Sequence, residues 1–179
     1  MQILLEHFFG SIGGVKLADS YSFIIYGHPA TKKNSATMAK NRSILLPSKT
    51  YREYEKLFKQ QMAALPKPVP HFNEGVQVTA RYYLKNKAHY PDLVGLMQAT
   101  ADLISDEYKV YNRKKRLVRE WLLSDDRIIK NWDGTEIVAI DKENPRVEIT
   151  ITPLYRCFSE ETDPYLIRIL KDKQQGRLF

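Results

Sequence analysis

Residues 89–104, which read H-Y-P-D-L-V-G-L-M-Q-A-T-A-D-L-I, and the later L-L-S-D-D at residues 122–126 decide the fold. Apolar residues and one threonine recur in the first segment at the spacing of one helical face, which predicts a helix of about three turns. These residues are Leu93, Leu96, Met97, Thr100, Leu103 and Ile104. Pro91 disfavours helical geometry at Tyr90, and Asp92 is a favourable N-cap. We therefore expect the helix to begin at Asp92, with that carboxylate at the rim of the apolar face.

The segments on either side predict an α+β fold. A second helix is expected at residues 50–65, where Thr50 and Glu53 form a capping box. Apolar or alternating runs predict strands at residues 20–27, 76–84, 122–129, 135–140 and 146–152. We expect Ser124, Asp125 and Asp126 to interrupt the third of these strands, and the last two strands to form a hairpin. The expected architecture is a single mixed or antiparallel sheet with two main helices packed on it, plus a C-terminal helix that begins at Asp163.

Composition and charge limit the classes of function. The 179-residue chain, 43% hydrophobic and 27% charged, is expected to form one soluble domain. Its single cysteine, Cys157, excludes an intrachain disulfide and a cysteine-rich zinc site. The net charge of +7 favours a polyanionic partner such as nucleic acid, although a ribosomal or membrane-surface contact would give the same charge. No apolar run of about 18 residues, P-loop or dinucleotide fingerprint occurs, so neither a membrane span nor a nucleotide cofactor is expected.

Cationic side chains concentrate in segments that flank the first helix discussed above. The segment 28–47, expected to be a loop or hairpin, contains no acidic residue, and the insert 105–120, expected to be partly helical, mixes cations with aromatic residues. Such side chains suit phosphate contacts and base stacking, whereas solvated loops and helical faces are the alternatives. The candidate DNA-binding residues are Lys32, Lys33, Lys40, Arg42, Lys87, Arg113, Lys114, Lys115 and Arg116.

The acidic pattern of the chain resembles that of the RusA-type Holliday-junction resolvases over roughly residues 20–153. The resemblance consists of Pro-Asp-Leu, a helix with a further Asp ten residues on, and a later Asp-Asp beside an apolar strand. By position, Asp92 matches the first carboxylate of the family, Asp125 and Asp126 match the later pair, and Asp102 matches an acidic position on the helix. The sequence departs from the family pattern at three positions where the family has Asp, Asn and Lys; these are Val94, Gly95 and Gln98.

The resemblance implies an endonuclease that resolves four-way DNA junctions by paired nicks and uses Mg²⁺ or Mn²⁺. It implies that Asp92 and Asp126, helped by Asp125, are the catalytic metal ligands, and that Gln98 orients water or phosphate. Paired nicks on opposite strands need two active sites, so a homodimer is expected. The setting implied is the cytoplasm of a bacterial or phage-infected cell. The alternatives are a non-catalytic basic DNA-binding protein with the same fold and an RNA- or ribosome-associated basic domain.

The spacing of the carboxylates separates their expected roles. Mg²⁺ usually keeps several waters, so two carboxylates can suffice to bind it. Asp92 and Asp102 lie about 15 Å apart along one helix at 1.5 Å per residue, so Asp102 is expected to support the site from the second shell or to pair with a nearby cation. Asp133, seven residues after Asp126, is expected in a turn. Asp125 and Asp126 would point to opposite faces of a regular strand, and the residues leave open which of them faces Asp92. The family resemblance favours Asp126.

Overall fold

The computed structural model of the protein describes residues 20–32, 37–38, 45–88, 90–111 and 114–154, together with positions 164, 167, 168 and 171. The candidate DNA-binding residues Lys33, Lys40, Arg42 and Arg113 lie outside the described residues, as do the side chain of Lys115 and most of the expected C-terminal helix. The expectations for these residues stay predictions.

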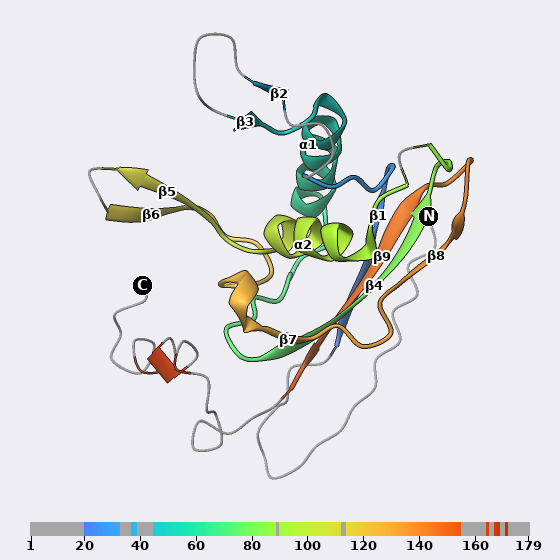
Figure 1. The fold of residues 1–179 in the computed structure, drawn as a ribbon. Helices are drawn as coiled ribbons and strands as arrows, with labels where there is room; N and C mark the ends of the chain where they lie inside the picture. The colour runs from blue at the N-terminus through green and yellow to red at the C-terminus, as the bar shows by residue number, and fades with distance from the viewer. Residues whose placement is uncertain are drawn as a thin grey trace.

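A mixed five-stranded sheet forms the centre of the molecule, as the sequence predicts (Figure 1). Strands follow one another in the order β1-β9-β4-β7, and β8 pairs with a different part of β4. β9 runs antiparallel to both of its neighbours, whereas β7 and β8 run parallel to β4. The bounds are β1 Tyr21–Tyr26, β4 Val76–Leu84, β7 Ile129–Asn131, β8 Glu136–Ile140 and β9 Arg146–Pro153.

The expected hairpin between residues 135–140 and 146–152 is wrong, because β4 lies between β8 and β9. Val147 of β9 is the partner of Tyr82 on one edge of β4, and Ile137 of β8 is the partner of the same residue on the other edge. The chain therefore crosses the end of β4 between the two strands, where Asp141 N donates to Leu84 O over 2.7 Å. Alternation of apolar residues specifies which face of a strand is buried, but it does not specify the neighbouring strand.

The buried face of the sheet packs against two helices, α1 (Lys49–Ala63) and α2 (Leu93–Ile104). Every second residue of β4 from Val76 to Leu84 is buried, as its alternation predicts. On β9, Val147, Ile149 and Ile151 are buried in the same core. The Tyr82 hydroxyl and the Thr100 hydroxyl form a hydrogen bond of 2.8 Å, which ties β4 to α2 within this core. None of the described helices is long and apolar enough to cross a membrane.

The start of α1 differs from the expected capping box. Ser48, one residue before the helix, is the N-cap, and its Oγ accepts a hydrogen bond from Tyr51 N over 3.1 Å. Thr50 lies inside the helix, and Glu53 forms an ion pair with Lys49 at 3.8 Å. The predicted capping box between Thr50 and Glu53 is therefore wrong, because a serine two positions earlier in the sequence takes the cap.

Replacing Ser48 with alanine is expected to destabilise the protein by about 1 kcal/mol, because the cap hydrogen bond is lost at a buried helix end. Thr50→Ala is the matched control, and we expect it to change stability by less than about 0.5 kcal/mol. Urea denaturation of both variants measures the difference. A larger loss in Thr50→Ala than in Ser48→Ala would show that Thr50 caps the helix.

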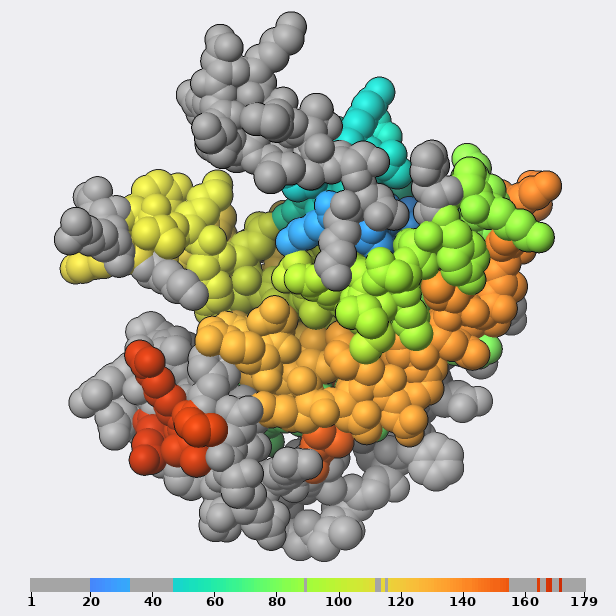
Figure 2. All heavy atoms as spheres, viewed as in Figure 1, coloured from blue at the N-terminus to red at the C-terminus, as the bar shows by residue number. Residues whose placement is uncertain are grey.

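Two small antiparallel sheets lie outside the central sheet. β2 (Thr37–Met38) pairs with β3 (Leu45–Leu46), and this antiparallel pair agrees with the hairpin alternative for the described part of residues 28–47. β5 (Glu107–Tyr111) pairs with β6 (Lys114–Arg119). The insert was expected to be partly helical, and this expectation is wrong. Its valines and tyrosines favour extended backbone. The β5–β6 hairpin projects from the body of the molecule (Figures 1 and 2).

The chain between the hairpin and β7 is not the interrupted strand that the sequence predicts. Leu122 and Leu123 are fully buried in a connecting segment, where Leu123 makes isolated bridges to Phe72 and Ser105. A 3-10 helix, η1 (Asp126–Ile128), follows, and β7 is short. The turn predicted at residues 132–134 is confirmed, with Gly134 at a φ of 72°.

Candidate functional site

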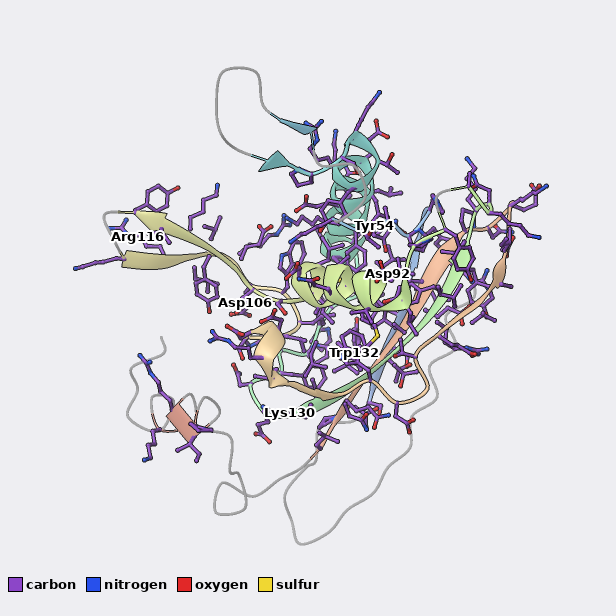
Figure 3. All side chains as sticks on the ribbon, in the orientation of Figure 1. Tyr54, Asp92, Asp106, Arg116, Lys130 and Trp132 are labelled. Carbon is purple, nitrogen blue, oxygen red and sulfur yellow. The ribbon has the colours of Figure 1, made fainter. Side chains whose placement is uncertain are left out.

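Asp92 is the N-cap of α2, as predicted. Its Oδ1 accepts a hydrogen bond from Gly95 N over 2.6 Å. Gly95 is packed so closely that an added Cβ would lie 3.0 Å from Asp92 Oδ1 and 3.1 Å from Thr31 Cγ2. A larger residue at this position, such as the Asn of the resolvase pattern, would therefore have to displace the capping carboxylate or Thr31. Asp92 stands at the end of α2 that is farther from the β5–β6 hairpin (Figure 3).

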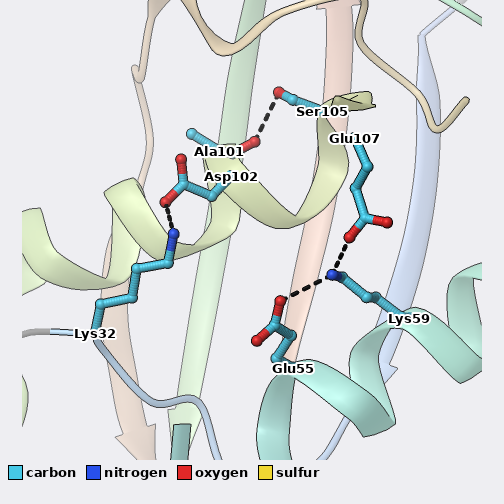
Figure 4. A network of polar contacts seen from close by, with 7 residues as sticks. All are labelled: Lys32, Glu55, Lys59, Ala101, Asp102, Ser105 and Glu107. Atoms are coloured by element: carbon cyan, nitrogen blue, oxygen red, sulfur yellow. Dashed lines mark hydrogen bonds and ion pairs between the residues drawn. The ribbon is translucent and has the colours of Figure 1, made fainter. Parts of the chain in front are cut away.

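Asp102, near the other end of α2, pairs with a cation as its spacing predicts. Lys32 Nζ lies 2.5 Å from Asp102 Oδ2 and 5.8 Å from the centre of the Tyr51 ring (Figure 4). Lys32 comes from the segment after β1, Tyr51 from α1 and Asp102 from α2. Three elements that are distant in the sequence therefore meet at this ion pair, and Lys32 places one positive charge beside α2.

Asp125 and Asp126 lie at η1 instead of within a regular strand. Asp125 Oδ1 accepts hydrogen bonds from Arg127 N at 3.0 Å and from Arg127 Nε at 2.8 Å, and Asp125 Oδ2 accepts one from Arg127 Nη2 at 2.9 Å. Asp125 thus caps a turn and binds the adjacent arginine. Because η1 replaces the expected strand, the expectation that these two carboxylates point to opposite faces does not apply.

The surroundings of Asp126 favour its protonated form. Partial burial raises the pKa of Asp126, and a hydrogen bond with Asp125, the charge of Asp125 and the charge of Asp102 raise it further, whereas Arg127 lowers it. Asp102 therefore lies within electrostatic reach of Asp126, and α2 contacts η1. We call Asp102, Asp125 and Asp126 the acidic cluster.

The residues implied as metal ligands are only partly brought together. Among the described residues, no three His, Cys, Asp or Glu side chains form a group that could hold a metal ion. The α2 carboxylate whose charge acts on Asp126 is that of Asp102, whereas Asp92 is at the opposite end of the helix. Two carboxylates can suffice for a cation that keeps several waters, so Asp125 and Asp126 remain the candidate ligands, although Arg127 binds both oxygens of Asp125.

The exposed face of α2 connects the two ends of the helix. Val94, Gln98 and Asp102 follow one another at intervals of four residues and so lie along one side of α2. The Val94 side chain is 65% exposed, and Gln98 is exposed as well. Gln98 therefore stands between the helix start and the acidic cluster, facing solvent.

The described cationic candidates lie in different places. Lys32 is bound to Asp102, and Lys87 is exposed in the loop that leads from β4 to α2. Lys114 and Arg116 are exposed on β6, far out on the hairpin (Figure 3). The hairpin residues thus provide a cationic surface that projects from the body, whereas Lys32 supplies charge at the acidic cluster itself.

Long-range contacts that the sequence does not reveal hold the root of the hairpin. Asp106 Oδ1 accepts a hydrogen bond from Trp121 N over 2.7 Å, and Asp106 Oδ2 lies 3.2 Å from His71 Nε2. Lys59 of α1 binds both Glu55, at 2.8 Å, and Glu107 of β5 (Figure 4). These bonds fix where the hairpin leaves the body, next to the end of α2.

The arginine at the end of β6 also braces the root. The guanidinium carbon of Arg119 lies 4.2 Å from the centre of the Trp121 ring, a cation–π distance, and Trp121 is buried. Ser105, at the end of α2, bridges to Leu123, and Asp106 N donates to Leu123 O over 2.8 Å. The chain segment that ends in Asp125 and Asp126 is therefore attached directly to the root of the hairpin.

Asp126→Asn is expected to raise the melting temperature at neutral pH. A carboxyl group with a raised pKa binds more protons in the folded than in the unfolded state between its ordinary and its folded pKa, so stability falls as pH rises through that window. Asparagine removes the repulsion between the ionised Asp126 and its acidic neighbours. The gain in melting temperature should shrink as pH falls to about 4, because Asp126 is then increasingly protonated. Thermal melts between about pH 4 and pH 8 measure the effect. A variant that melts below the wild type at neutral pH would show that the ionised Asp126 stabilises the fold.

Comparison with known proteins adds no family. No protein-family model matches the chain, and no curated protein matches it significantly. The resemblance to the resolvases therefore rests only on the sequence positions described above.

Proposed function

We propose that the protein is a metal-dependent, structure-selective endonuclease that cuts branched double-stranded DNA such as a four-way junction. One juxtaposition carries the proposal: the adjacent carboxylates Asp125 and Asp126 lie on the segment that is bonded to the root of a projecting cationic hairpin. The hairpin would hold the phosphate backbone, and a strand held at its root would pass near the carboxyl pair.

Asp126 and Asp125 would hold Mg²⁺ or Mn²⁺, and Asp102 would support them through its charge. A divalent cation supplies an activated water and neutralises charge on the scissile phosphate. Lys32 keeps the charge of Asp102 partly balanced and provides a cation that a phosphate oxygen could share. Gln98, exposed four residues before Asp102, would donate a hydrogen bond to phosphate or water. In this assignment Asp102 takes the place on α2 that the resemblance gives to Asp92.

Branched DNA is the proposed substrate because phosphate contacts alone read backbone geometry and not sequence. Junction resolution needs two nicks in opposite strands, so we propose that two copies of the chain act together as a homodimer. The proposed setting is the cytoplasm of a bacterial or phage-infected cell, as the resemblance implies.

A second candidate function, binding of branched DNA without cleavage, is favoured by the start of α2. Asp92 is used as a helix cap, and Val94 occupies the position of the family's second carboxylate with its side chain in solvent. A protein with this arrangement keeps the cationic hairpin and loses part of the metal site.

One assay separates the two candidates. A four-way junction, labelled in turn on each strand, is incubated with the full chain in Mn²⁺, in Mg²⁺ and in EDTA, with a linear duplex as control. Paired nicks in opposite strands of the junction, dependent on the metal, are the expected result. Salt-sensitive binding of the junction without nicks in either metal would support the non-catalytic candidate. Absence of both binding and nicking would overturn both.

A further inference from the structure

The β5–β6 hairpin has two chemically different faces. Directly paired residues of antiparallel strands share a face, and faces alternate along each strand. Tyr108 pairs with Leu117, which places them on one face with Val110 and its partner Lys115; we call this face, with its three large apolar residues, the apolar face. Lys109 pairs with Arg116, and Tyr111 pairs with Lys114, on the opposite, cationic face.

The large apolar side chains of the apolar face are exposed to solvent, which is unfavourable in the absence of a partner. Val110 is 67% exposed, Leu117 is 50% exposed and Tyr108 is 44% exposed. Contiguous exposed apolar side chains that are rimmed by charged residues mark an interaction surface. The hairpin between Tyr108 and Val118 contains cations and no acidic residue. Two copies of the hairpin placed face to face would bring like charges together, whereas nucleic acid complements this charge.

The root of the hairpin adjoins the segment that leads to the acidic cluster. The chain runs from the root of the hairpin through Leu123 to Asp125, and Leu123 is bonded to Asp106, the residue that precedes β5. Partial burial raises the pKa of Tyr108, and the charges of Asp106, Asp125 and Glu120 raise it further. A base held on this face would therefore bring its own phosphate towards Asp125 and Asp126.

We propose that the apolar face, Tyr108 with Val110 and Leu117, is a stacking platform for the unstacked bases at a DNA branch point, while the cationic face holds the backbone. A two-stranded ribbon has the dimensions of a DNA groove, and aromatic side chains stack on any base that is out of its helix. A continuous duplex offers no free base face, so this platform distinguishes a branch from a linear duplex. The inference rests on the proposed function, for which it names the element that selects the substrate.

The test is binding in EDTA, where cleavage does not contribute. Affinities for a four-way junction and for a linear duplex are measured by fluorescence anisotropy, and 2-aminopurine at the branch point reports stacking. Tyr108→Ala and Leu117→Ala are expected to weaken junction binding about 10-fold each and to leave duplex binding unchanged. Tyr108→Phe keeps the ring and is expected to keep the junction preference. Tyr26→Ala, an exposed tyrosine on β1, is the matched control and should have no effect.

Variants of the cationic face are expected to lose affinity without losing the preference for the junction. Lys109→Ala combined with Arg116→Ala is expected to weaken binding of the junction and of the duplex equally. The slope of log affinity against log salt concentration should fall by the amount expected for about two lost phosphate contacts. Lys142→Ala, an exposed lysine between β8 and β9, is the control.

Three outcomes would overturn the platform. If Tyr108→Ala keeps the full junction preference, the platform is wrong. The proposed function survives that result as long as the wild type nicks junctions. Loss of a wild-type dimer in Tyr108→Ala at unchanged junction preference would make the apolar face an interface between copies. A wild type that neither binds nor nicks junctions would remove the proposed function and the platform together.

Discussion

Asp126→Asn is expected to reduce junction cleavage at least 100-fold, or by about 2.7 kcal/mol of transition-state stabilisation, while junction binding stays within about threefold of wild type. Asparagine keeps the size of the side chain but removes the negative charge that a divalent cation requires. The same substitution removes repulsion within the acidic cluster, so the inactive variant should be at least as stable as the wild type at neutral pH. Loss of activity could then not be attributed to unfolding. Rates under single-turnover conditions in Mn²⁺ measure the effect.

Two control variants locate the chemistry. Asp133→Asn changes an exposed turn residue and should leave the rate unchanged. Asp92→Asn keeps a good N-cap, since Asn caps helices as well as Asp does, and we expect an effect at least 10-fold smaller than that of Asp126→Asn. Equal loss in Asp92→Asn and Asp126→Asn would show that the start of α2 joins the site when DNA is bound. An active Asp126→Asn would contradict the proposed site.

Leu96→Ala is expected to destabilise the protein by about 2–5 kcal/mol, the range for a large aliphatic side chain removed from a packed core. Leu96 is 1% exposed on the face of α2 that packs against the sheet. Loss of this packing would leave α2, which positions Asp102, poorly held. Urea denaturation, with the free energy of unfolding extrapolated to water, measures the loss.

The matched control lies two residues earlier on the same helix. Val94 is 65% exposed, so Val94→Ala should change the free energy of unfolding by less than about 0.5 kcal/mol. Similar losses in the two variants would mean that α2 does not use the face described here against the sheet.

Local patterns predicted the parts of the fold that depend on one segment alone. The alternation of β4 identified its buried residues, and Pro91 followed by Asp92 identified the start of α2. The rise per residue of a helix predicted that Asp102 would not share an ion with Asp92, and pairing with a cation was one of the two roles left open for it. Each of these inferences needs only geometry within one helix or strand.

Most of the parts that failed depend on contacts between distant residues. The neighbours of β4 and the 3-10 helix at Asp126 are decided by pairing and packing between distant segments. The hairpin form of the insert is local, and its strand-favouring valines and tyrosines were the signal that could have predicted it. At the site, the resemblance supplied matching positions but no distances, so it joined Asp92 to Asp126 where the structure brings Asp102 near instead. The bonds of Asp106 and Lys59 at the hairpin root link residues far apart in sequence, and no short motif predicts them.

Mn²⁺ binding to the DNA-free protein, followed by electron paramagnetic resonance, tests the acidic cluster most directly. The wild type is predicted to bind about one Mn²⁺ per chain, and binding is predicted to weaken as pH falls because Mn²⁺ and protons compete for the carboxylates. Asp126→Asn is predicted to bind it at least about 10-fold more weakly, and Asp133→Asn to bind it as the wild type does. Equal Mn²⁺ binding by the wild type and Asp126→Asn, or no binding by the wild type, would contradict the assignment of these carboxylates as metal ligands.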